Sequence, residues 1–320
     1  SNLADLMRTS QAMSHFVTDL GDIAGDIAHP TRKRFDVLRP GGRSVDVLMS
    51  GDPNGRPIIF MNGAFLFSFE AAIERCFAQA GLCVLAISRP GFGRTSSAPD
   101  EEDLADVIAD DTTAVLAQIG TSTAPILVHS TGVPMAFRAG RNFNGVVERL
   151  VIIGGMAPPD IMRAAGPGLP MSAALLTAAS TSKRLLRLLI SGRHRMYLRL
   201  GAERFLARQY ANCVPDRGQV ARPEFIAEYD TAVTTLTAQG FDPGTEEIIF
   251  SQTQWGRSVP TFPGPVRILH GTEDPLCPIA AMELFAQRYP DKITLTPLPG
   301  AGHITLPVRT KTIIDALNSP

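Results

Sequence analysis

The sequence predicts an α/β protein built on a doubly wound, mostly parallel sheet that carries a helical insertion. Short apolar runs without polar alternation are separated by helical stretches, which is typical of strands buried on both faces. This pattern stops after Ala157 and resumes near Pro263. The 320 residues correspond to two average domains of about 150 residues, or to one large domain with an insertion.

The composition is that of a globular protein. Hydrophobic residues make up 44% of the chain, charged residues 19%, and the formal net charge is −1. These values exclude a disordered chain or a polycation, so we expect no nucleic-acid binding by this segment. The apolar runs are far shorter than the ~18 residues of a membrane helix, so we expect no membrane contact. The four cysteines are widely spaced, which argues against a zinc site or disulfide scaffold and favours a cytoplasmic location.

Residues 1–30 predict an amphipathic helix, because apolar side chains recur at helical spacing from Leu3 to Ile27. We expect this helix to pack on its own domain; a homodimer arm and the remnant of a neighbouring domain are the alternatives. The chain begins with Ser1-Asn2 in place of a methionine, which is typical of a cloning remnant. This beginning is consistent with a missing native start, and the sequence leaves open whether an upstream domain is missing as well.

The core is predicted to comprise residues 31–156 and 264–320. It opens with a hairpin whose strands, Phe35–Leu38 and Val45–Met49, flank the turn Pro40-Gly41-Gly42. Helical crossovers then separate the buried strands, as a parallel sheet requires. The predicted buried strands are Pro57–Met61, Leu82–Ile87, Pro125–His129, Leu150–Ile153, Val266–His270 and Ile293–Pro297. The predicted core helices are Ala71–Ala80, Glu101–Ile119, Val133–Asn142, Ile279–Tyr289 and Val308–Leu317.

Residues 157–263 are predicted to form a helical cap, or lid. The segment contains helical patterns punctuated by proline and glycine, and no run in it is typical of a buried strand. Because the core helices already cover the faces of the sheet, these extra residues have one open end of the sheet left to cover.

Ser130 stands where a buried strand runs directly into a helix, in the stretch Ile126–Pro134. A serine in such a tight turn lifts its hydroxyl clear of the sheet, and the helix N-terminus directs backbone N–H groups at whatever binds beside it. Gly132 is the small residue that this turn needs, whereas Val128 departs from the G-x-S-x-G pattern. Serine also caps helices, so this pattern alone leaves both a nucleophile and a cap open.

Asp274 and His303 each follow a later predicted strand. Asp274 lies in the turn after Val266–His270, and His303 lies in the glycine-rich loop after Ile293–Pro297. Ligand sites of open α/β sheets lie at the carboxyl ends of the strands. The chain order serine, aspartate, histidine is the order of a catalytic triad on this kind of sheet.

These residues resemble the α/β-hydrolase superfamily over about Phe35 to Leu317. The stretch Ser88–Ser96 is similar to the D-R-P-G-F-G-x-S loop of that family, and Phe60–Ala64 lies where members usually carry His-Gly. Asn62 in place of that histidine and Ser88 in place of that aspartate are departures from the family pattern. The resemblance implies an α/β-hydrolase fold with a cap.

The same resemblance implies roles for named residues. Ser130 would be the nucleophile, His303 the base and Asp274 the orienting acid. The oxyanion hole would consist of the backbone N–H group of Thr131 and that of Ala64 or Phe65. Further candidates, for the substrate pocket, are Asn62, Phe67 and Trp255, although a large aromatic side chain is more often part of the core.

We therefore predict a serine hydrolase that cleaves a carboxylic ester, or a related acyl bond, of a small to medium substrate through an acyl-enzyme. This chemistry needs no metal and no organic cofactor. One alternative is a ligand-binding or regulatory module with little turnover, such as a fragment of a larger transcriptional regulator. Another keeps the three residues but uses them in a C–C bond hydrolase or an acyltransferase.

Overall fold

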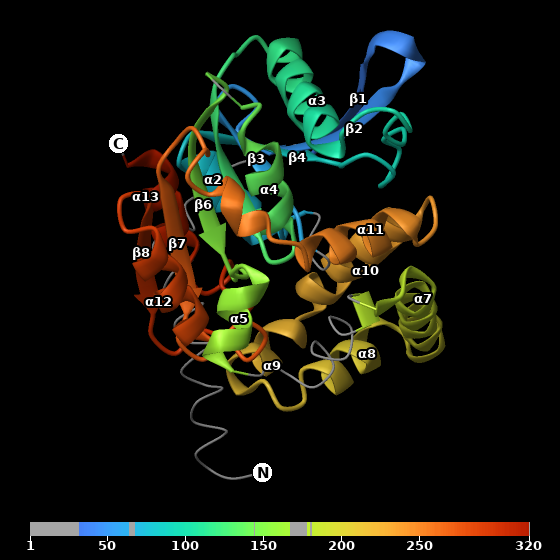
Figure 1. Ribbon diagram of the computed structural model, residues 1–320, viewed down its shortest axis with the longest axis vertical. Helices are drawn as coiled ribbons and strands as arrows, with labels where there is room; N and C mark the ends of the chain where they lie inside the picture. Colours follow the sequence, from blue (N-terminus) through green and yellow to red (C-terminus); the bar gives the residue numbers. More distant parts are fainter. Residues whose placement is uncertain (1–31, 64–67, 144, 167–177, 180, 320) are drawn as a thin grey trace.

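The computed structural model describes residues 32–63, 68–143, 145–166, 178–179 and 181–319. The predicted helix over residues 1–30, with the homodimer arm it would form, lies outside these residues, as do Ala64, Phe65 and Phe67. Eight strands form one sheet in the order β1-β2-β4-β3-β5-β6-β7-β8 (Figure 1). Strand β2 pairs antiparallel with β1 and β4, and all other neighbours in this sheet pair parallel. The predicted fold class is confirmed.

The strands follow the predicted apolar runs closely. Strands β1 and β2 form the predicted hairpin around the short helix η1, Pro40–Gly42. Strands β3 to β7 are runs that lack polar alternation, and most of their residues are buried, whereas the edge strand β8 alternates and has two buried residues of six. The strand bounds are β1 Lys33–Leu38, β2 Ser44–Gly51, β3 Arg56–Met61, β4 Leu82–Ile87, β5 Ala124–His129, β6 Val147–Ile153, β7 Val266–Gly271 and β8 Ile293–Leu298.

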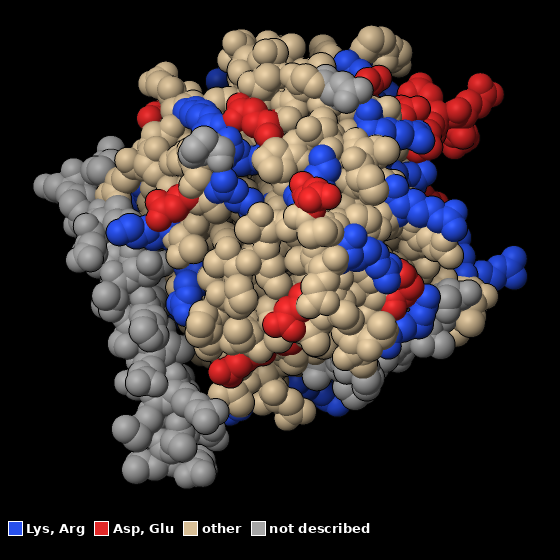
Figure 2. Space-filling model, turned by 60° about the vertical axis from the view of Figure 1, so that its left-hand side comes forward, with Lys and Arg blue, Asp and Glu red and all other residues tan. Residues whose placement is uncertain are grey.

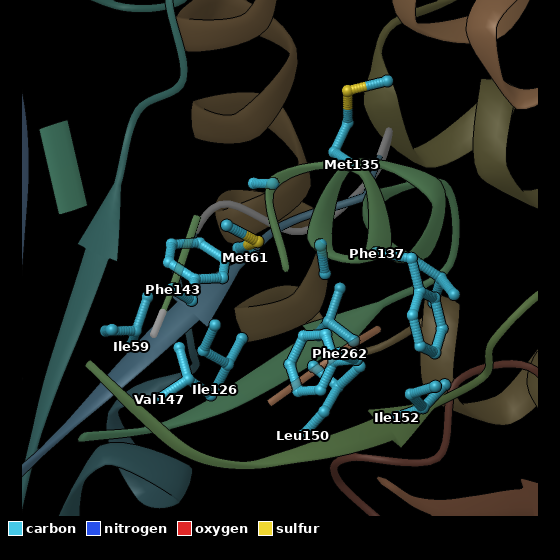
Figure 3. Close-up of a cluster of buried hydrophobic side chains, with 14 of the residues drawn as sticks. Ile59, Met61, Ile126, Met135, Phe137, Phe143, Val147, Leu150, Ile152 and Phe262 are labelled. Carbon is cyan, nitrogen blue, oxygen red and sulfur yellow. The ribbon is translucent and has the colours of Figure 1, made fainter. Parts of the chain in front are cut away.

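Helices cover both faces of the sheet, and the two faces have separate cores. Ile59 and Met61 of β3 pack in the core that includes α3, α4 and α12, whereas Ile58 and Phe60 pack on the other face with α2 and α13. This division follows from the alternation of side chains along a strand. Figure 3 shows the first core, where side chains of α4 lie over those of the strands. The helix bounds are α2 Ala71–Gln79, α3 Leu104–Gln118, α4 Gly132–Gly140, α12 Ile279–Arg288 and α13 Thr310–Asn318.

A helical segment joins β6 to β7, and we call residues 157–263 the helical insertion. Its helices gather beyond one end of the sheet and lie beside the core (Figure 1). Within the described residues, none of the insertion is a strand. Its helices are α5 Pro159–Ala165, α7 Lys183–Leu200, α8 Ala202–Gln209, α9 Val214–Val220, α10 Pro223–Thr237, α11 Asp242–Ser251 and η2 Trp255–Ser258.

Trp255 belongs to the core and not to a substrate pocket, which corrects the prediction for this residue. Its side chain is 2% exposed, and its ring stacks on Phe137 of α4 with the centroids 5.6 Å apart. The indole N–H donates to the carbonyl oxygen of Ser251. The indole therefore fills space beside α4 and α12, as buried aromatic side chains usually do.

The surface carries charges of both signs. Figure 2 shows basic and acidic side chains interspersed over one face of the molecule. The basic helix α7 forms ion pairs with the acidic side chains of α11, through Lys183 with Glu246 and Arg187 with Asp242. Among the described helices, none is both long enough and apolar enough to span a bilayer.

Candidate active site

Ser130 occupies a strained turn between β5 and α4. Its φ is +50°, and among the described residues it is the one non-glycine residue with a positive φ. Such a conformation costs about 1–3 kcal/mol and persists where the surroundings enforce it, often at a functional site. Gly132 allows the turn, because a Cβ atom there would lie 2.7 Å from the carbonyl oxygen of Asn62. The substitution of glycine by Val128 on the other side of Ser130 leaves the turn intact.

Asp274 is held in the loop after β7 by the backbone around it. Its Oδ1 accepts hydrogen bonds from the N–H groups of Leu276 at 2.8 Å and Cys277 at 3.0 Å. Burial acts to raise the pKa of Asp274, but the neighbouring His303 and the backbone donors outweigh it and the pKa is lowered. The side chain is therefore a fixed carboxylate at neutral pH.

His303 lies between this carboxylate and Ser130. Its Nδ1 is 2.8 Å from Oδ2 of Asp274, and its Nε2 is 3.2 Å from Oγ of Ser130. An ionised Asp274 accepts a hydrogen bond from Nδ1–H, so Nε2 of the neutral ring is free to accept the hydrogen bond of the serine hydroxyl. The structure thus brings together three side chains that are separated by up to 173 positions in the chain.

The pKa of His303 is set by opposing effects. Burial of the ring acts to lower the pKa, whereas the charges of Asp274 and Asp216 and the hydrogen bond to Asp274 raise it, and the net shift is upward. A raised pKa makes the imidazole a stronger base toward the serine hydroxyl.

His270 forms a second layer behind Asp274. Its Nε2 lies 2.7 Å from the carbonyl oxygen of Cys277 and 3.4 Å from Oδ2 of Asp274. Burial lowers the pKa of His270, so the ring is neutral and Nε2–H donates toward these oxygens. The sequence identifies His270 only as the end of a buried strand, and its role beside Asp274 becomes visible in the structure.

The described residues contain one group with the composition of a metal site. Possible ligand atoms of Asp274, Cys277 and His303 lie within 4.8 Å of one another. However, the carboxylate and the imidazole are already hydrogen-bonded to each other, and burial raises the pKa of the Cys277 thiol well above its usual value. The group is therefore better described as an acid–base pair with a protonated thiol beside it.

Two backbone segments, Thr131 and Gly63, lie beside Ser130. Thr131 is the N-cap of α4, so its N–H group lies at the positive end of the helix dipole, and the residue lines the cavity described below. Gly63 lies against the serine, since a Cβ atom on Gly63 would be 2.8 Å from Cβ of Ser130. The loop that follows Gly63 contains the predicted donors Ala64 and Phe65, which are outside the described residues.

Asn62 braces this loop and does not line the cavity, contrary to its prediction as a pocket residue. Its side-chain amide donates to the carbonyl oxygen of Gly63 at 3.0 Å. Its backbone oxygen and its Oδ1 both accept from the guanidinium of Arg89, at 2.9 and 3.1 Å. Arg89 in turn forms a bidentate ion pair with Glu247 of α11, in which Nε donates to Oε1 at 2.5 Å and Nη2 donates to Oε2 at 2.8 Å. The helical insertion therefore reaches the loop through one buried ion pair.

A cavity of about 310 Å³ opens in front of Ser130 and His303. It lies between the carboxyl ends of the strands and the insertion, and helices α7, α8, α10 and α11 contribute half of its lining residues. The wall is mainly apolar, and three of the four tyrosines of the chain are part of it. The aromatic lining residues are Phe92, Tyr197, Phe205, Tyr210, Tyr229 and Phe241.

The fold and this site define a class of protein, and comparison with known proteins agrees with it. Residues 58–311 match the family described as "Alpha/beta hydrolase family". Because the match covers more than half of the 320 residues, the chain belongs to the alpha/beta hydrolase family.

Relatives and solved structures add detail. A non-heme haloperoxidase of Rhodococcus erythropolis is 27% identical over 263 residues, which are 81% of this chain and 90% of that protein. A bifunctional esterase/perhydrolase of Acinetobacter calcoaceticus is 28% identical over 235 residues, 71% of this chain and 77% of that protein. An esterase of Exiguobacterium antarcticum has a TM-score of 0.60 at 16% identity, covering 90% of this chain and all of that one, and shares the fold. The chain is an enzyme of the hydrolase class.

Proposed function

We propose that this protein is a serine hydrolase that cleaves carboxylic esters through an acyl-enzyme on Ser130. The observation that carries the proposal is the continuous contact from Asp274 through His303 to Ser130, at 2.8 and 3.2 Å. The strained φ of +50° at Ser130 and the helix N-terminus beside it support the same role.

The reaction would proceed in two halves. As Oγ of Ser130 attacks the ester carbonyl, its proton passes to Nε2 of His303, and Asp274 stabilises the imidazolium. The carbonyl oxygen becomes an oxyanion that accepts from the N–H group of Thr131 and from a donor of the loop after Gly63. Collapse of this intermediate breaks the bond to the alcohol, which takes the proton from His303. Water then repeats the sequence on the acyl-enzyme, releasing the acid and restoring the serine.

The cavity favours an ester with a bulky apolar or aromatic group. A volume of about 310 Å³ is at the lower end of the usual range for small-molecule sites, and its wall holds six aromatic side chains. We therefore expect an ester with a bulky apolar or aromatic group to be preferred over a small polar one.

Labelling with a fluorophosphonate probe tests the proposal. We expect wild type and the control Ser97→Ala, an exposed serine, to be labelled, and Ser130→Ala to stay unlabelled. Turnover of p-nitrophenyl esters should fall on the order of 10⁶-fold in kcat with Ser130→Ala. Equal labelling of wild type and Ser130→Ala would contradict the proposal, and an absence of any labelling or turnover would favour a ligand-binding or regulatory module.

A second candidate function follows from the names of two relatives. The relatives named haloperoxidase and bifunctional esterase/perhydrolase lead us to propose that hydrogen peroxide also accepts the acyl group from Ser130. In this step the peroxide oxygen attacks the acyl carbonyl, His303 accepts its proton, and a peracid leaves while the serine regains its hydrogen. We expect peracid formation from an ester and hydrogen peroxide to be lost with Ser130→Ala. Ester hydrolysis without peracid formation would contradict this second function alone.

A further inference from the structure

A carboxylate of the helical insertion reaches the loop that carries His303. Asp216 lies in α9, and its side chain is buried. Its Oδ2 accepts a hydrogen bond from the N–H group of His303 at 2.9 Å, and its Oδ1 accepts one from the N–H group of Ile304 at 3.0 Å. Both oxygens of one side chain are thus satisfied by two successive amides, the arrangement by which backbone commonly holds an anion.

The loop is shaped around this carboxylate. A Cβ atom on Gly302 would lie 2.6 Å from Cγ of Asp216, which is closer than real Cβ atoms approach. Gly302 has no positive φ, so its backbone conformation is open to other residues and the carboxylate is what requires glycine here. Gly300, with φ of +71°, is required by the turn itself.

We infer that Asp216 is a positioning residue for the base: it fixes the loop so that His303 stands between Asp274 and Ser130, and its charge supports the imidazolium. This inference rests on the proposed function. Two hydrogen bonds to an ionised acceptor hold a backbone segment more firmly than two hydrogen bonds to a neutral acceptor. Since a displacement of about 1 Å at a catalytic group costs on the order of 100-fold in rate, such a hold has a direct effect on kcat.

The ionisation of Asp216 falls in the range where the enzyme would work. Burial raises the pKa of Asp216 to about 6, although the two amide donors and His303 act to lower it. The pKa of Asp274 is lowered, and burial raises that of Cys213 to about 11 and that of Tyr210 well above its usual value. The titratable or charged groups that face Asp216 or its neighbours His303 and Asp274 are Tyr210, Cys213, Arg217, Tyr229, His129, His270 and Cys277. Burial lowers the pKa of His129 to about 3 and also lowers that of His270, so near neutral pH the charges that change in this group are those of Asp216 and His303.

The test compares wild type with Asp216→Asn and with Glu224→Gln. Glu224 is an exposed residue of α10 in the same insertion, so Glu224→Gln makes an equal change of charge away from the loop. The measurement is kcat/KM against pH on a p-nitrophenyl ester. Wild type needs both an ionised Asp216 and a neutral His303, so at acid pH its log kcat/KM should fall with a slope of about two.

Asp216→Asn removes one of these ionisations. The amide keeps one acceptor oxygen for two N–H groups, so we expect kcat to fall about 10- to 100-fold. The acid limb should become a slope of about one and move to lower pH, because the pKa of His303 decreases when a neighbouring negative charge is lost. Glu224→Gln should keep the wild-type curve. A reduced kcat with the wild-type slope and midpoint would overturn the inference, since it would show a structural role only, and so would an unchanged kcat.

A readout that needs no turnover separates this inference from the proposed function. The imidazole signal of His303, titrated by NMR, should report a lower pKa in Asp216→Asn than in wild type. An unchanged pKa overturns the inference even in an inactive protein. An absence of Ser130-dependent labelling in wild type contradicts the proposed function instead, and the NMR comparison then decides the inference alone.

Gly302→Ala leaves Asp216 in place, so it tests the inference even if Asp216→Asn does not fold, because its methyl group displaces the carboxylate. We expect Gly302→Ala to lower kcat at least about tenfold, and an unchanged kcat would overturn the inference. Where Asp216→Ala folds, it makes room for the methyl group, and the further loss caused by Gly302→Ala in that background should be under about threefold. Equal losses in both backgrounds would show that Gly302 does not act through Asp216 and would overturn the inference.

Discussion

Replacing Glu247 by leucine should destabilise the protein strongly, because it leaves the guanidinium of Arg89 buried without its counter-charge. The two side chains are 3% and 9% exposed and share contacts of 2.5 and 2.8 Å. Removing one partner of such a buried pair costs about 3–5 kcal/mol. The double variant Arg89→Met/Glu247→Leu removes both charges, and its main remaining cost is the two acceptors of Asn62 left without Arg89, about 1–3 kcal/mol.

Urea unfolding followed by circular dichroism measures these free energies. The matched control is Glu246→Leu, the adjacent residue of α11, whose pair with Lys183 has side chains that are 56% and 53% exposed. An exposed pair contributes under about 1 kcal/mol. The reasoning is refuted if Glu247→Leu costs no more than Glu246→Leu, or if the double variant is less stable than Glu247→Leu. Because Arg89 also holds Asn62, and Glu247 lines the cavity, a fall in kcat/KM should accompany Glu247→Leu.

Three further predictions concern the base, the core and the cavity. Because the pKa of His303 is raised and the base must be neutral, kcat/KM should fall as pH drops through a value above the ordinary ~6.5 of histidine; a midpoint at or below that value would contradict the assigned shift. Trp255→Ala should lower the free energy of unfolding by about 3–5 kcal/mol and leave KM unchanged. An altered KM with unchanged stability would instead show that Trp255 lines the substrate pocket. Val233→Trp narrows the cavity wall at α10, so kcat/KM for long-chain p-nitrophenyl esters should fall on the order of 10-fold while that for the acetate is kept; equal losses for both would argue against binding of the acyl chain there.

The fold was predictable because its signals are local. A strand buried on both faces is a continuous apolar run, and the crossover between parallel strands has a helical period, so both are visible in a window of about ten residues. The positions of Ser130, Asp274 and His303 were predictable for a related reason. Each of them lies in the segment that follows a strand, and the carboxyl ends of parallel strands meet at one edge of the sheet.

The residues that hold the site in place could not be predicted, because their partners are distant in the chain. Glu247 and Arg89 are 158 positions apart, and Asp216 lies 87 positions before His303. An acidic residue in an amphipathic helix carries no local signal that it will be buried against a backbone amide. For Trp255 the failure is of another kind: size and apolarity suit a core and a pocket equally well, and packing against Phe137 decides between them.

Two buried carboxylates of the insertion, Glu247 and Asp216, contact two different loops of the core through hydrogen bonds. Glu247 in α11 reaches the loop after β3 through Arg89, and Asp216 in α9 reaches the loop that carries His303. In the proposed mechanism one loop holds the oxyanion and the other holds the base, so the geometry between them would depend on how the insertion packs on the core. An insertion that served only to cover the cavity would need apolar contacts alone, and two desolvated carboxylates are a costly addition unless each fixes something that packing does not. In this proposal, the contacts of Glu247 and Asp216 would fix both the position of the cavity wall and the alignment of the catalytic groups.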